Sequence, residues 1–270
     1  MRRMWLSLLL CIALLLPVWS VPLAAQDAPV LDRIVKSNEL RVGMSGGQPP
    51  FTVKSKSGEL IGYEVDVARL LANAMGVELK LVEKPFGELL DALTAGEVDV
   101  VMSGMTMTPE RNLRAAFVGP YIVSGKSILT KDRTLARADE AQDIDLANVK
   151  IVALANSTSQ KFAETFLSKA QLVTTSDYDE AVKMILDDKA TALVADYPVC
   201  ALSVMRYADS GLVTLAEPLT IEPIGIAISP GDSLLLNMIE NYLGALEAVG
   251  LLAELEAKWF EDGGWLMQLP

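Results

Sequence analysis

The chain has 270 residues, a formal net charge of −12 from 35 acidic and 23 basic residues, and no histidine. The acidic balance disfavours nucleic acid and anionic lipid as partners. The absence of histidine excludes serine–histidine and cysteine–histidine catalysis and histidine-bearing zinc sites, and we expect neither a metal nor a cofactor.

The first 25 residues have the order of a secretory signal peptide. Arg2 and Arg3 precede an apolar run over residues 5–16, and the small residues Ala24 and Ala25 end the segment. An uncleaved membrane anchor is the alternative, but two prolines interrupt the apolar stretch. We therefore predict cleavage near Ala25 and a periplasmic protein. Only one cysteine, Cys200, would remain, so no internal disulfide is expected.

Hydrophobic periodicity in the first half predicts alternating helices and strands. A short helix and a strand are followed by a hairpin around Ser57-Gly58 and by a helix that ends near Gly76, a residue suited to a helix C-cap. The continuous apolar run at 98–103 is typical of a strand buried in a parallel sheet. The expected strands are 40–44, 51–54, 59–63, 78–82 and 98–103, and the expected helices are 31–37, 65–76 and 86–95.

The second half repeats this order. We expect strands at 150–154, 172–175 and 191–195, helices at 159–169 and 179–186, and one long amphipathic helical region over 232–260. Two extended stretches marked by proline and glycine, 119–125 and 217–225, lie between the halves. If the chain crosses out and back there, residues 26–122 and 219–270 form a discontinuous first lobe, and residues 123–218 form an inserted second lobe.

Polar residues follow the predicted strand 98–103, where open α/β sheets bind ligands. Ser103, Gly104 and Thr106 offer hydroxyls and backbone N–H groups. Thr108-Pro109 resembles the start of a new helix, with Arg111 in its first turn.

Arg111 has two interpretations from spacing alone. A cation in a first helical turn is slightly disfavoured by the helix dipole, which suggests a ligand contact. The alternative is a surface arginine paired with Glu110 or Asp99, and the sequence does not separate the two.

The matching features in the second half are Ser157, Thr158 and Asp196. Ser157 with Gln160 fits a capping box at the start of a helix, which could hold a carboxylate or be a simple cap. Asp196 follows the predicted strand 191–195, and it could be either an ion-pair partner or a residue at the corner of a hairpin. Together, Arg111, Thr106 and Thr158 suit the carboxylate of an α-amino acid, and Asp196 suits its ammonium group.

At these positions the chain resembles the polar amino-acid-binding family of periplasmic solute-binding proteins, family 3, which serve ABC importers. The resemblance covers nearly the whole chain after the signal peptide. It rests on Leu40-Arg-Val-Gly, Pro49-Pro-Phe51, Leu60-Ile-Gly-Tyr-Glu-Val-Asp-Val-Ala, the run from Val98 to Arg111, and Phe117-Val-Gly-Pro-Tyr. It implies a type II periplasmic-binding-protein fold: two α/β lobes, two crossover strands at the hinge, and a ligand in the cleft.

The resemblance also implies roles for single residues. Arg111 would hold the ligand carboxylate with help from Thr106 and Thr158, and Asp196 with Ser103 or Gly104 would hold the ammonium group. Phe86 falls where the family places an apolar or aromatic residue against the ligand side chain.

Two positions depart from the family pattern. Gln48 stands where an aromatic residue usually covers the ligand, and Ser45 stands where binders of cationic amino acids often carry an acid. The second departure leads us away from lysine, arginine or histidine as the ligand.

The expected function is that of a monomeric, non-enzymatic binding protein that closes on an amino-acid-like solute and delivers it to a membrane permease and ATPase. Two alternatives remain open. The first is an enzyme on the same scaffold, because dehydratases acting on prephenate-like acids resemble this family. The second is a ligand-binding partner of a membrane sensor.

Overall fold

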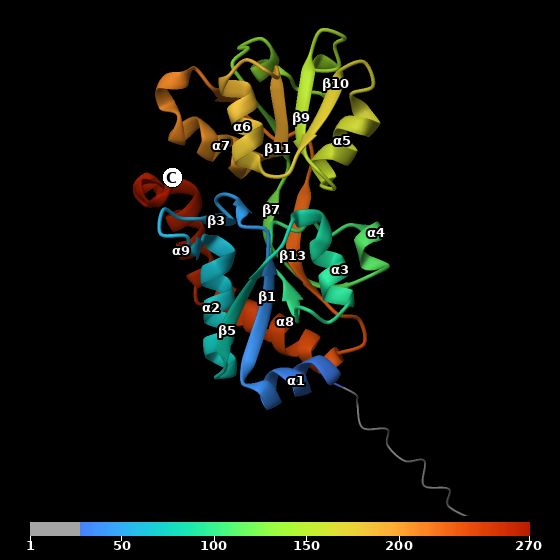
Figure 1. Ribbon diagram of the computed structural model, residues 1–270, viewed down its shortest axis with the longest axis vertical. Helices are drawn as coiled ribbons and strands as arrows, with labels where there is room; N and C mark the ends of the chain where they lie inside the picture. Colours follow the sequence, from blue (N-terminus) through green and yellow to red (C-terminus); the bar gives the residue numbers. More distant parts are fainter. Residues whose placement is uncertain (1–27) are drawn as a thin grey trace, which may run out of the picture.

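The lower half of the molecule in Figure 1 is built on a five-stranded sheet in the order β5-β1-β6-β13-β7. The computed structural model describes residues 28–270, so the predicted signal peptide lies outside the described residues. β1 pairs in parallel with β5 and β6, whereas β13 runs antiparallel to β6 and β7. The strands are β1 (Glu39–Met44), β5 (Glu78–Glu83), β6 (Val100–Val101), β7 (Ala116–Ser124) and β13 (Glu222–Ile228).

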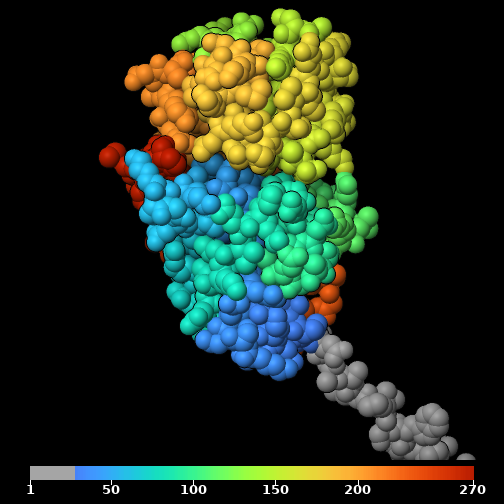
Figure 2. Space-filling model, in the orientation of Figure 1, coloured from blue at the N-terminus to red at the C-terminus, as the bar shows by residue number. Residues whose placement is uncertain are grey.

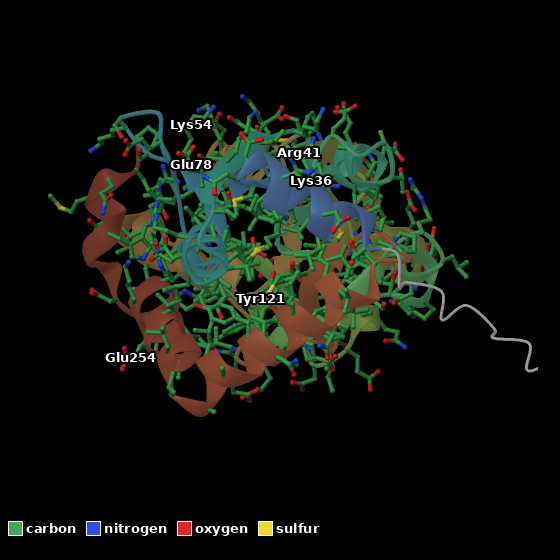
Figure 3. All side chains as sticks on the ribbon, turned by 90° about the horizontal axis from the view of Figure 1, so that it is seen from below. Lys36, Arg41, Lys54, Glu78, Tyr121 and Glu254 are labelled. Atoms are coloured by element: carbon green, nitrogen blue, oxygen red, sulfur yellow. The ribbon has the colours of Figure 1, made fainter. Side chains whose placement is uncertain are left out.

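Helices and a small sheet complete this lower lobe. The helices are α1 (Pro29–Ser37), α2 (Tyr63–Met75), α3 (Leu89–Thr94), α4 (Pro109–Asn112), α8 (Ser233–Ala248) and α9 (Leu251–Glu256). The small antiparallel sheet contains β2 (Gly47–Gln48), β3 (Thr52–Lys54) and β4 (Leu60–Ile61). Seen from below in Figure 3, the buried Tyr121 lies in the interior, while charged side chains such as Lys54 and Glu254 lie at the outside.

The upper lobe has its own five-stranded sheet in the order β10-β9-β11-β8-β12. β9 pairs in parallel with β10 and β11, and β8 pairs antiparallel with β11. The strands are β8 (Lys126–Thr130), β9 (Lys150–Leu154), β10 (Gln171–Thr175), β11 (Ala192–Asp196) and β12 (Val213–Thr214), and the helices are α5 (Thr158–Phe166), α6 (Tyr178–Leu186) and α7 (Tyr197–Arg206). Short helical turns complete the chain at Phe86–Glu88, Leu135–Arg137, Ala141–Asp143, Ala208–Ser210, Ala257–Glu261 and Gly263–Gln268.

Two extended segments connect the lobes. β7 in the lower sheet continues through Gly125 into β8, and β12 leads back into β13 (Figure 1). The two segments touch, because a Cβ atom added at Gly125 would lie 1.9 Å from the carbonyl oxygen of Thr220. Only glycine permits this approach. The lobe boundaries at 122/123 and 218/219 stay predictions, although both chain crossings occur close to them.

Local sequence signals explain several elements directly. The predicted strand at 150–154 agrees with β9, and α2 ends at Gly76, whose φ of 67° is the left-handed conformation that glycine adopts without strain. The predicted hairpin forms β3 and β4. Thr108 caps α4, because its side chain accepts from the N–H of Arg111.

Other element predictions were wrong in length. The strand expected at 98–103 covers only Val100–Val101, because residues 98–99 precede the ladder and the residues after Val101 form a loop at the carboxyl end of this central strand. The long helix expected over 232–260 is divided into α8, α9 and a π-helical turn, since Gly250 adopts a φ of 78° between the two helices. The predicted helix 86–95 begins with a 3₁₀ turn, and helix 159–169 already ends at Phe166.

The lobes are in contact along the cleft, as the space-filling view in Figure 2 shows. One continuous cluster of buried apolar side chains runs from the lower sheet into the upper lobe, where it includes Val152 and Tyr178. A second cluster around Ile128, Ile151 and Val194 fills the other face of the upper sheet. Burial of this kind contributes about 1.5–3 kcal/mol for each large apolar side chain. Between residues 28 and 270, no helix combines the length and the apolar character needed to cross a membrane.

Candidate functional site

The carboxyl ends of the parallel strands in both lobes point toward the gap between them. β1 and β6 end there in the lower lobe, and β9 and β11 end there in the upper lobe. The lobes meet at this place: the hydroxyl oxygens of Thr106 and Thr158 are 3.3 Å apart. The structure therefore brings together two residues that the sequence analysis predicted from separate halves of the chain.

The loop that follows β6 is fixed against the second crossover. The N–H of Met107 donates to the carbonyl of Pro223 at 2.7 Å, and the N–H of Gly225 donates to the carbonyl of Met105 at 3.2 Å. Thr106 forms a single β-bridge with Ile224 between these bonds. The loop is consequently held at the hinge by backbone bonds, and Thr106 is buried at the boundary between the lobes.

Arg111 lies at this boundary with its guanidinium group over the ring of Phe86, 5.5 Å from the ring centre. Its Nη1 donates to the carbonyl of Thr106 at 2.9 Å. Stacking on an aromatic ring and one backbone bond leave other N–H donors of the fork available.

The surface interpretation of Arg111 required Glu110 or Asp99 as its partner, and both carboxylates are engaged elsewhere. Asp99 pairs with Arg33 and Arg41, and Glu110 pairs with Lys161 of the upper lobe. Among the described residues, no carboxylate lies within ion-pair distance of Arg111. Burial lowers the pKa of Arg111, and the more distant carboxylates of Asp196 and Glu222 oppose that shift.

Gln48 and Ser103 form an uncharged hydrogen-bonded group in the lower lobe. The Ser103 hydroxyl donates to the Gln48 Oε1 at 2.7 Å, and the Ser45 hydroxyl donates to the same oxygen at 2.9 Å. The N–H of Ser45 donates to the Ser103 hydroxyl oxygen at 3.0 Å. The two positions that depart from the family pattern thus bind each other and Ser103.

The N–H of Gly104, which the sequence analysis offered to a ligand, is already used. It donates to Oε1 of Glu64 at 2.7 Å, and the Tyr121 hydroxyl donates to the same oxygen. Glu64 has no exposed surface, and its Oε2 atom has no hydrogen-bond partner. Burial raises the pKa of Glu64 to about 7. No sequence signal distinguished this acid from a surface residue in the first turn of α2.

In the upper lobe Ser157 is the N-cap of α5, with its Oγ accepting from the N–H groups of Ser159 and Gln160. The predicted capping box does not form, because the Gln160 side chain accepts from the N–H of Asn156, one residue before the cap. The helix start nevertheless places Thr158 against the lower lobe.

Asp196 is not a free acid at the cleft. It lies directly opposite Lys126 in the antiparallel pair of β11 and β8, and Oδ1 accepts from the Lys126 ammonium group at 2.6 Å. A second acid, Glu222, lies 3.5 Å from the same ammonium group. The side chain of Lys126 is 1% exposed and that of Asp196 is 6% exposed. Sequence reasoning missed Lys126 and Glu222, since a charged residue at either end of a strand normally lies in solvent.

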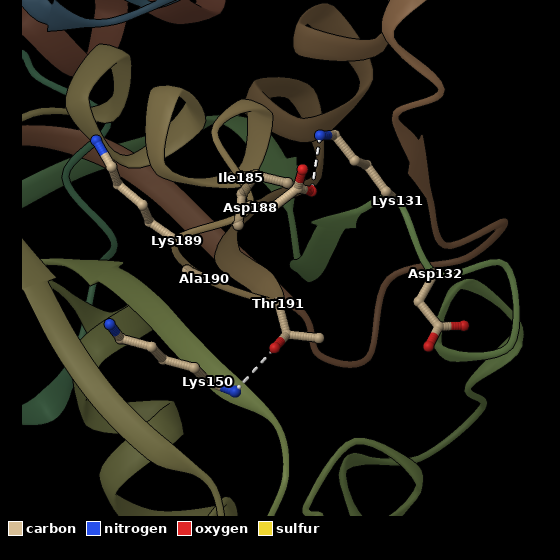
Figure 4. A pocket seen from close by; sticks show the side chains of 8 residues that line it. All are labelled: Lys131, Asp132, Lys150, Ile185, Asp188, Lys189, Ala190 and Thr191. Carbon is tan, nitrogen blue, oxygen red and sulfur yellow. Dashed lines mark hydrogen bonds and ion pairs between the residues drawn. The ribbon is translucent and has the colours of Figure 1, made fainter.

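The mouth of the cleft has a volume of about 840 Å³ and is lined from both lobes, by Phe86 and Arg111 below and by Asn156, Thr158 and Lys161 above. A smaller depression of about 380 Å³ lies at the amino ends of β9 and β11, away from the cleft (Figure 4). There the Lys131 ammonium group already pairs with Asp188. Residues 28–270 contain no cluster of three or more acidic or cysteine side chains arranged for a metal ion.

The sequence and the fold match known proteins over most of the chain. A family model described as bacterial extracellular solute-binding proteins, family 3, matches residues 40–262. A cyclohexadienyl dehydratase of Pseudomonas aeruginosa is 29% identical over 253 residues, which cover 94% of this chain and 92% of that protein. An L-arginine-binding protein of the same organism is 30% identical over 256 residues, covering 92% and 94%.

Among solved structures, an ancestral amino-acid-binding protein described as a precursor of cyclohexadienyl dehydratase matches with a TM-score of 0.79 and 35% identity. The match covers 86% of this chain and 99% of that one. The structural likeness confirms the two-lobed α/β fold that the sequence motifs predicted.

Proposed function

The chain belongs to the bacterial extracellular solute-binding proteins, family 3, and from this premise we propose that it is the periplasmic binding component of an ABC importer. It encloses a small amino acid or amino-acid-like solute between its lobes and delivers it to a permease and ATPase in the inner membrane. The resemblance inferred from the motifs between Leu40 and Tyr121 is confirmed by the family match.

The observation that carries this proposal is the environment of Arg111. Its guanidinium group is held on Phe86 and on the Thr106 carbonyl, yet no carboxylate within residues 28–270 pairs with it. A partly buried cation without a counter-charge is costly, and a ligand carboxylate would supply the missing partner through two parallel hydrogen bonds. Thr158, across the interface, would add a hydroxyl donor from the other lobe.

The remaining roles follow from the same arrangement. Asp196 would receive the ligand ammonium group through the oxygen that Lys126 leaves available. Phe86 and Gln48 would contact the ligand side chain. Ser103 and Gly104 would hold the loop that follows β6 in place through their bonds to Gln48 and Glu64. Ser157 would act through the helix start that positions Thr158.

Calorimetry with the purified chain lacking residues 1–25 tests the proposal. We expect one L-amino acid from a panel of the twenty to bind at 1:1 stoichiometry with micromolar or tighter affinity, about −8 kcal/mol or better. Failure of every amino acid to bind would contradict it. Transport is tested separately, by uptake of the labelled ligand into cells with and without the gene.

A dehydratase is the second candidate, and two observations favour it. The dehydratase relative covers nearly the whole chain, and Glu222, partly exposed at the hinge, is an acid that could act on a substrate. Incubation with prephenate and detection of product by absorbance separates the two functions. Product formed by the wild-type chain at a rate abolished in Glu222→Gln would favour the enzyme.

A further inference from the structure

Three charged side chains converge where the two crossover segments meet the upper sheet. Lys126 begins β8 in the first crossover, Glu222 begins β13 in the second, and Asp196 ends β11. The Lys126 ammonium group is 2.6 Å from Asp196 and 3.5 Å from Glu222. We call these three residues the hinge cluster. Because it contains one cation and two carboxylates, the hinge cluster has a net charge of −1.

Glu222 is held in place rather than free to turn into solvent. Its Oε1 accepts from the Thr220 hydroxyl at 3.1 Å, and the oxygen of that hydroxyl accepts from the N–H of Lys126 at 2.9 Å. The next residue, Pro223, receives the N–H of Met107 from the loop that leads to Arg111. The acid is therefore fixed beside the cleft, and its side chain is 14% exposed.

The hinge cluster and Arg111 act on each other across the cleft. Asp196 and Glu222 are the carboxylates that most strongly support the charge of Arg111, although neither lies within ion-pair distance of it. The closed cleft thus holds one unpaired positive charge on one side and one excess negative charge on the other. Each side therefore lacks one contact of opposite sign, and a charge largely removed from water without such a contact is costly.

We infer that Glu222 is a specificity-determining residue that provides, with Asp196, the counter-charge for a ligand ammonium group. Lys126 neutralises only one of the two carboxylate charges, so one negative charge remains for the ligand. The inference rests on the proposed function and names its ligand class: a zwitterion with an uncharged side chain. The two cations of the site are Arg111 and Lys126, and its two carboxylates are Asp196 and Glu222. Their charges sum to zero, so a zwitterion with no net charge leaves the site neutral.

The wall on the lower-lobe side supports an uncharged ligand side chain. Phe86, Gln48, Ser45 and Ser103 bring no charge to it. Glu64 lies behind Gly104 and is enclosed by that N–H and by the Tyr121 hydroxyl. The four wall residues offer no carboxylate to a guanidinium or ammonium side chain, and the lower-lobe acid at the cleft mouth, Glu110, is already paired with Lys161. The expected ligand class therefore differs from that named for the arginine-binding relative.

The first test compares Glu222→Gln with wild type by calorimetry, using two probes. One is the neutral L-amino acid that wild type binds best, and the other is the 2-hydroxy acid with the same side chain, which lacks the ammonium group. We expect Glu222→Gln to weaken the amino acid at least tenfold and not to weaken the anionic hydroxy acid, because the variant site carries one net positive charge. Glu217→Gln, an exposed acid before the same crossover, is the matched control and should change neither affinity.

An equal loss for both probes would make Glu222 a structural residue, and no loss for either would exclude it from recognition. Both outcomes overturn the inference. Tighter binding of L-arginine or L-lysine than of every neutral amino acid overturns the ligand class. If wild type binds no amino acid, the proposed function is overturned as well. If wild type binds a neutral amino acid but Glu222→Gln leaves the ratio of amino-acid to hydroxy-acid affinity unchanged, only the inference is overturned.

A second variant changes the cluster charge in the opposite direction. Lys126→Met leaves both carboxylates without their cation, so we expect binding of L-arginine or L-lysine to gain at least tenfold relative to the neutral amino acid. Circular dichroism verifies that the variant is folded. An unchanged ratio in the folded variant would contradict the charge balance on which the inference depends.

Discussion

The two edges of the cleft are built from similar units but carry different chemistry. In the lower lobe, helix α3 leads through a short turn into β6 and then to Ser103, whose hydroxyl is bonded to Gln48. In the upper lobe, α6 leads into β11 and then to Asp196, which is ion-paired with Lys126. Around Ser103 the lower edge carries no charge at its surface and keeps its acid, Glu64, one layer deeper, while its cation, Arg111, lies farther along the loop that follows β6.

The comparison teaches that a repeated helix–strand unit determines where a polar group lies, but not which charge it carries. The charge depends on the neighbouring element: β8 supplies a lysine opposite Asp196, whereas the segment after β1 supplies an amide and a hydroxyl opposite Ser103. Substitutions at each edge should therefore have different consequences.

The largest effect is expected for Lys126→Ala at the charged edge. Removing one partner of a buried ion pair leaves Asp196 without its counter-charge, which should lower the free energy of unfolding by about 3–5 kcal/mol. Urea unfolding at pH 7 measures this. Lys131→Ala is the matched control, because Lys131 pairs with the exposed Asp188 (Figure 4) and should lose no more than about 1 kcal/mol. Similar losses in the two variants would show that the charged edge is not special.

The hidden acid of the lower edge should appear as a pH dependence of stability. The pKa of Glu64 in the folded chain, about 7, lies above its usual value of 4.5, so the folded state favours the protonated form. The contribution of Glu64 to the free energy of unfolding is fully present below pH 4.5. It is lost as pH rises through 7, which lowers the free energy of unfolding by about 3 kcal/mol in all. Glu64→Gln should lack this loss between pH 5 and pH 8 in urea unfolding. Parallel stability profiles for the two proteins would refute the assignment.

A smaller effect is expected in binding from Arg111→Ala. Loss of charge-assisted hydrogen bonds to a ligand carboxylate should cost about 1.5–3 kcal/mol, or roughly a 10- to 150-fold weaker affinity by calorimetry. Arg69→Ala, an exposed arginine on α2 paired with Asp66, should bind as wild type does. Normal affinity in Arg111→Ala would remove the carboxylate clamp from the proposed site.

The smallest effect is expected for Ser103→Ala at the uncharged edge. Gln48 keeps its bond from Ser45, so only neutral hydrogen bonds are lost and stability should fall by about 1 kcal/mol. Ser57→Ala at the exposed hairpin turn should change it by less than about 0.5 kcal/mol. A loss as large as that of Lys126→Ala would erase the contrast between the two edges.

Much of the fold could be predicted from the sequence, because apolar periodicity and cap residues are local signals. β9, the end of α2 at Gly76 and the cap at Thr108 follow from neighbouring residues alone. The division of the last long helix was missed, because glycine also occurs inside helices and the sequence alone does not show that Gly250 adopts a left-handed conformation before α9.

The site was predictable only where a motif marks it. Arg111, Thr106 and Thr158 stand in recognisable runs, and the structure brings Thr106 and Thr158 together. Lys126 and Glu64 carry no local sign of their burial, because the partners that neutralise or enclose them lie 70 and 57 positions away in the chain. Long-range pairing of charges is a property of the topology, and periodicity does not reveal it.

The close approach at Gly125 determines how the two lobes can separate. The two crossover segments touch at Gly125 and Thr220 and are paired on both sides of that contact, so they cannot slide past each other, and opening would be a rotation about them. Groups next to a rotation axis move least, and groups far from it move most. Lys126 and Glu222 adjoin the axis and would keep their spacing, whereas Thr158 belongs to the lobe that turns and would leave Thr106, which is bridged to Ile224 at the hinge. We therefore expect the half of the site that receives a positive group to exist before closure and the half that receives a negative group to be completed by it, so that a solute docks amine first.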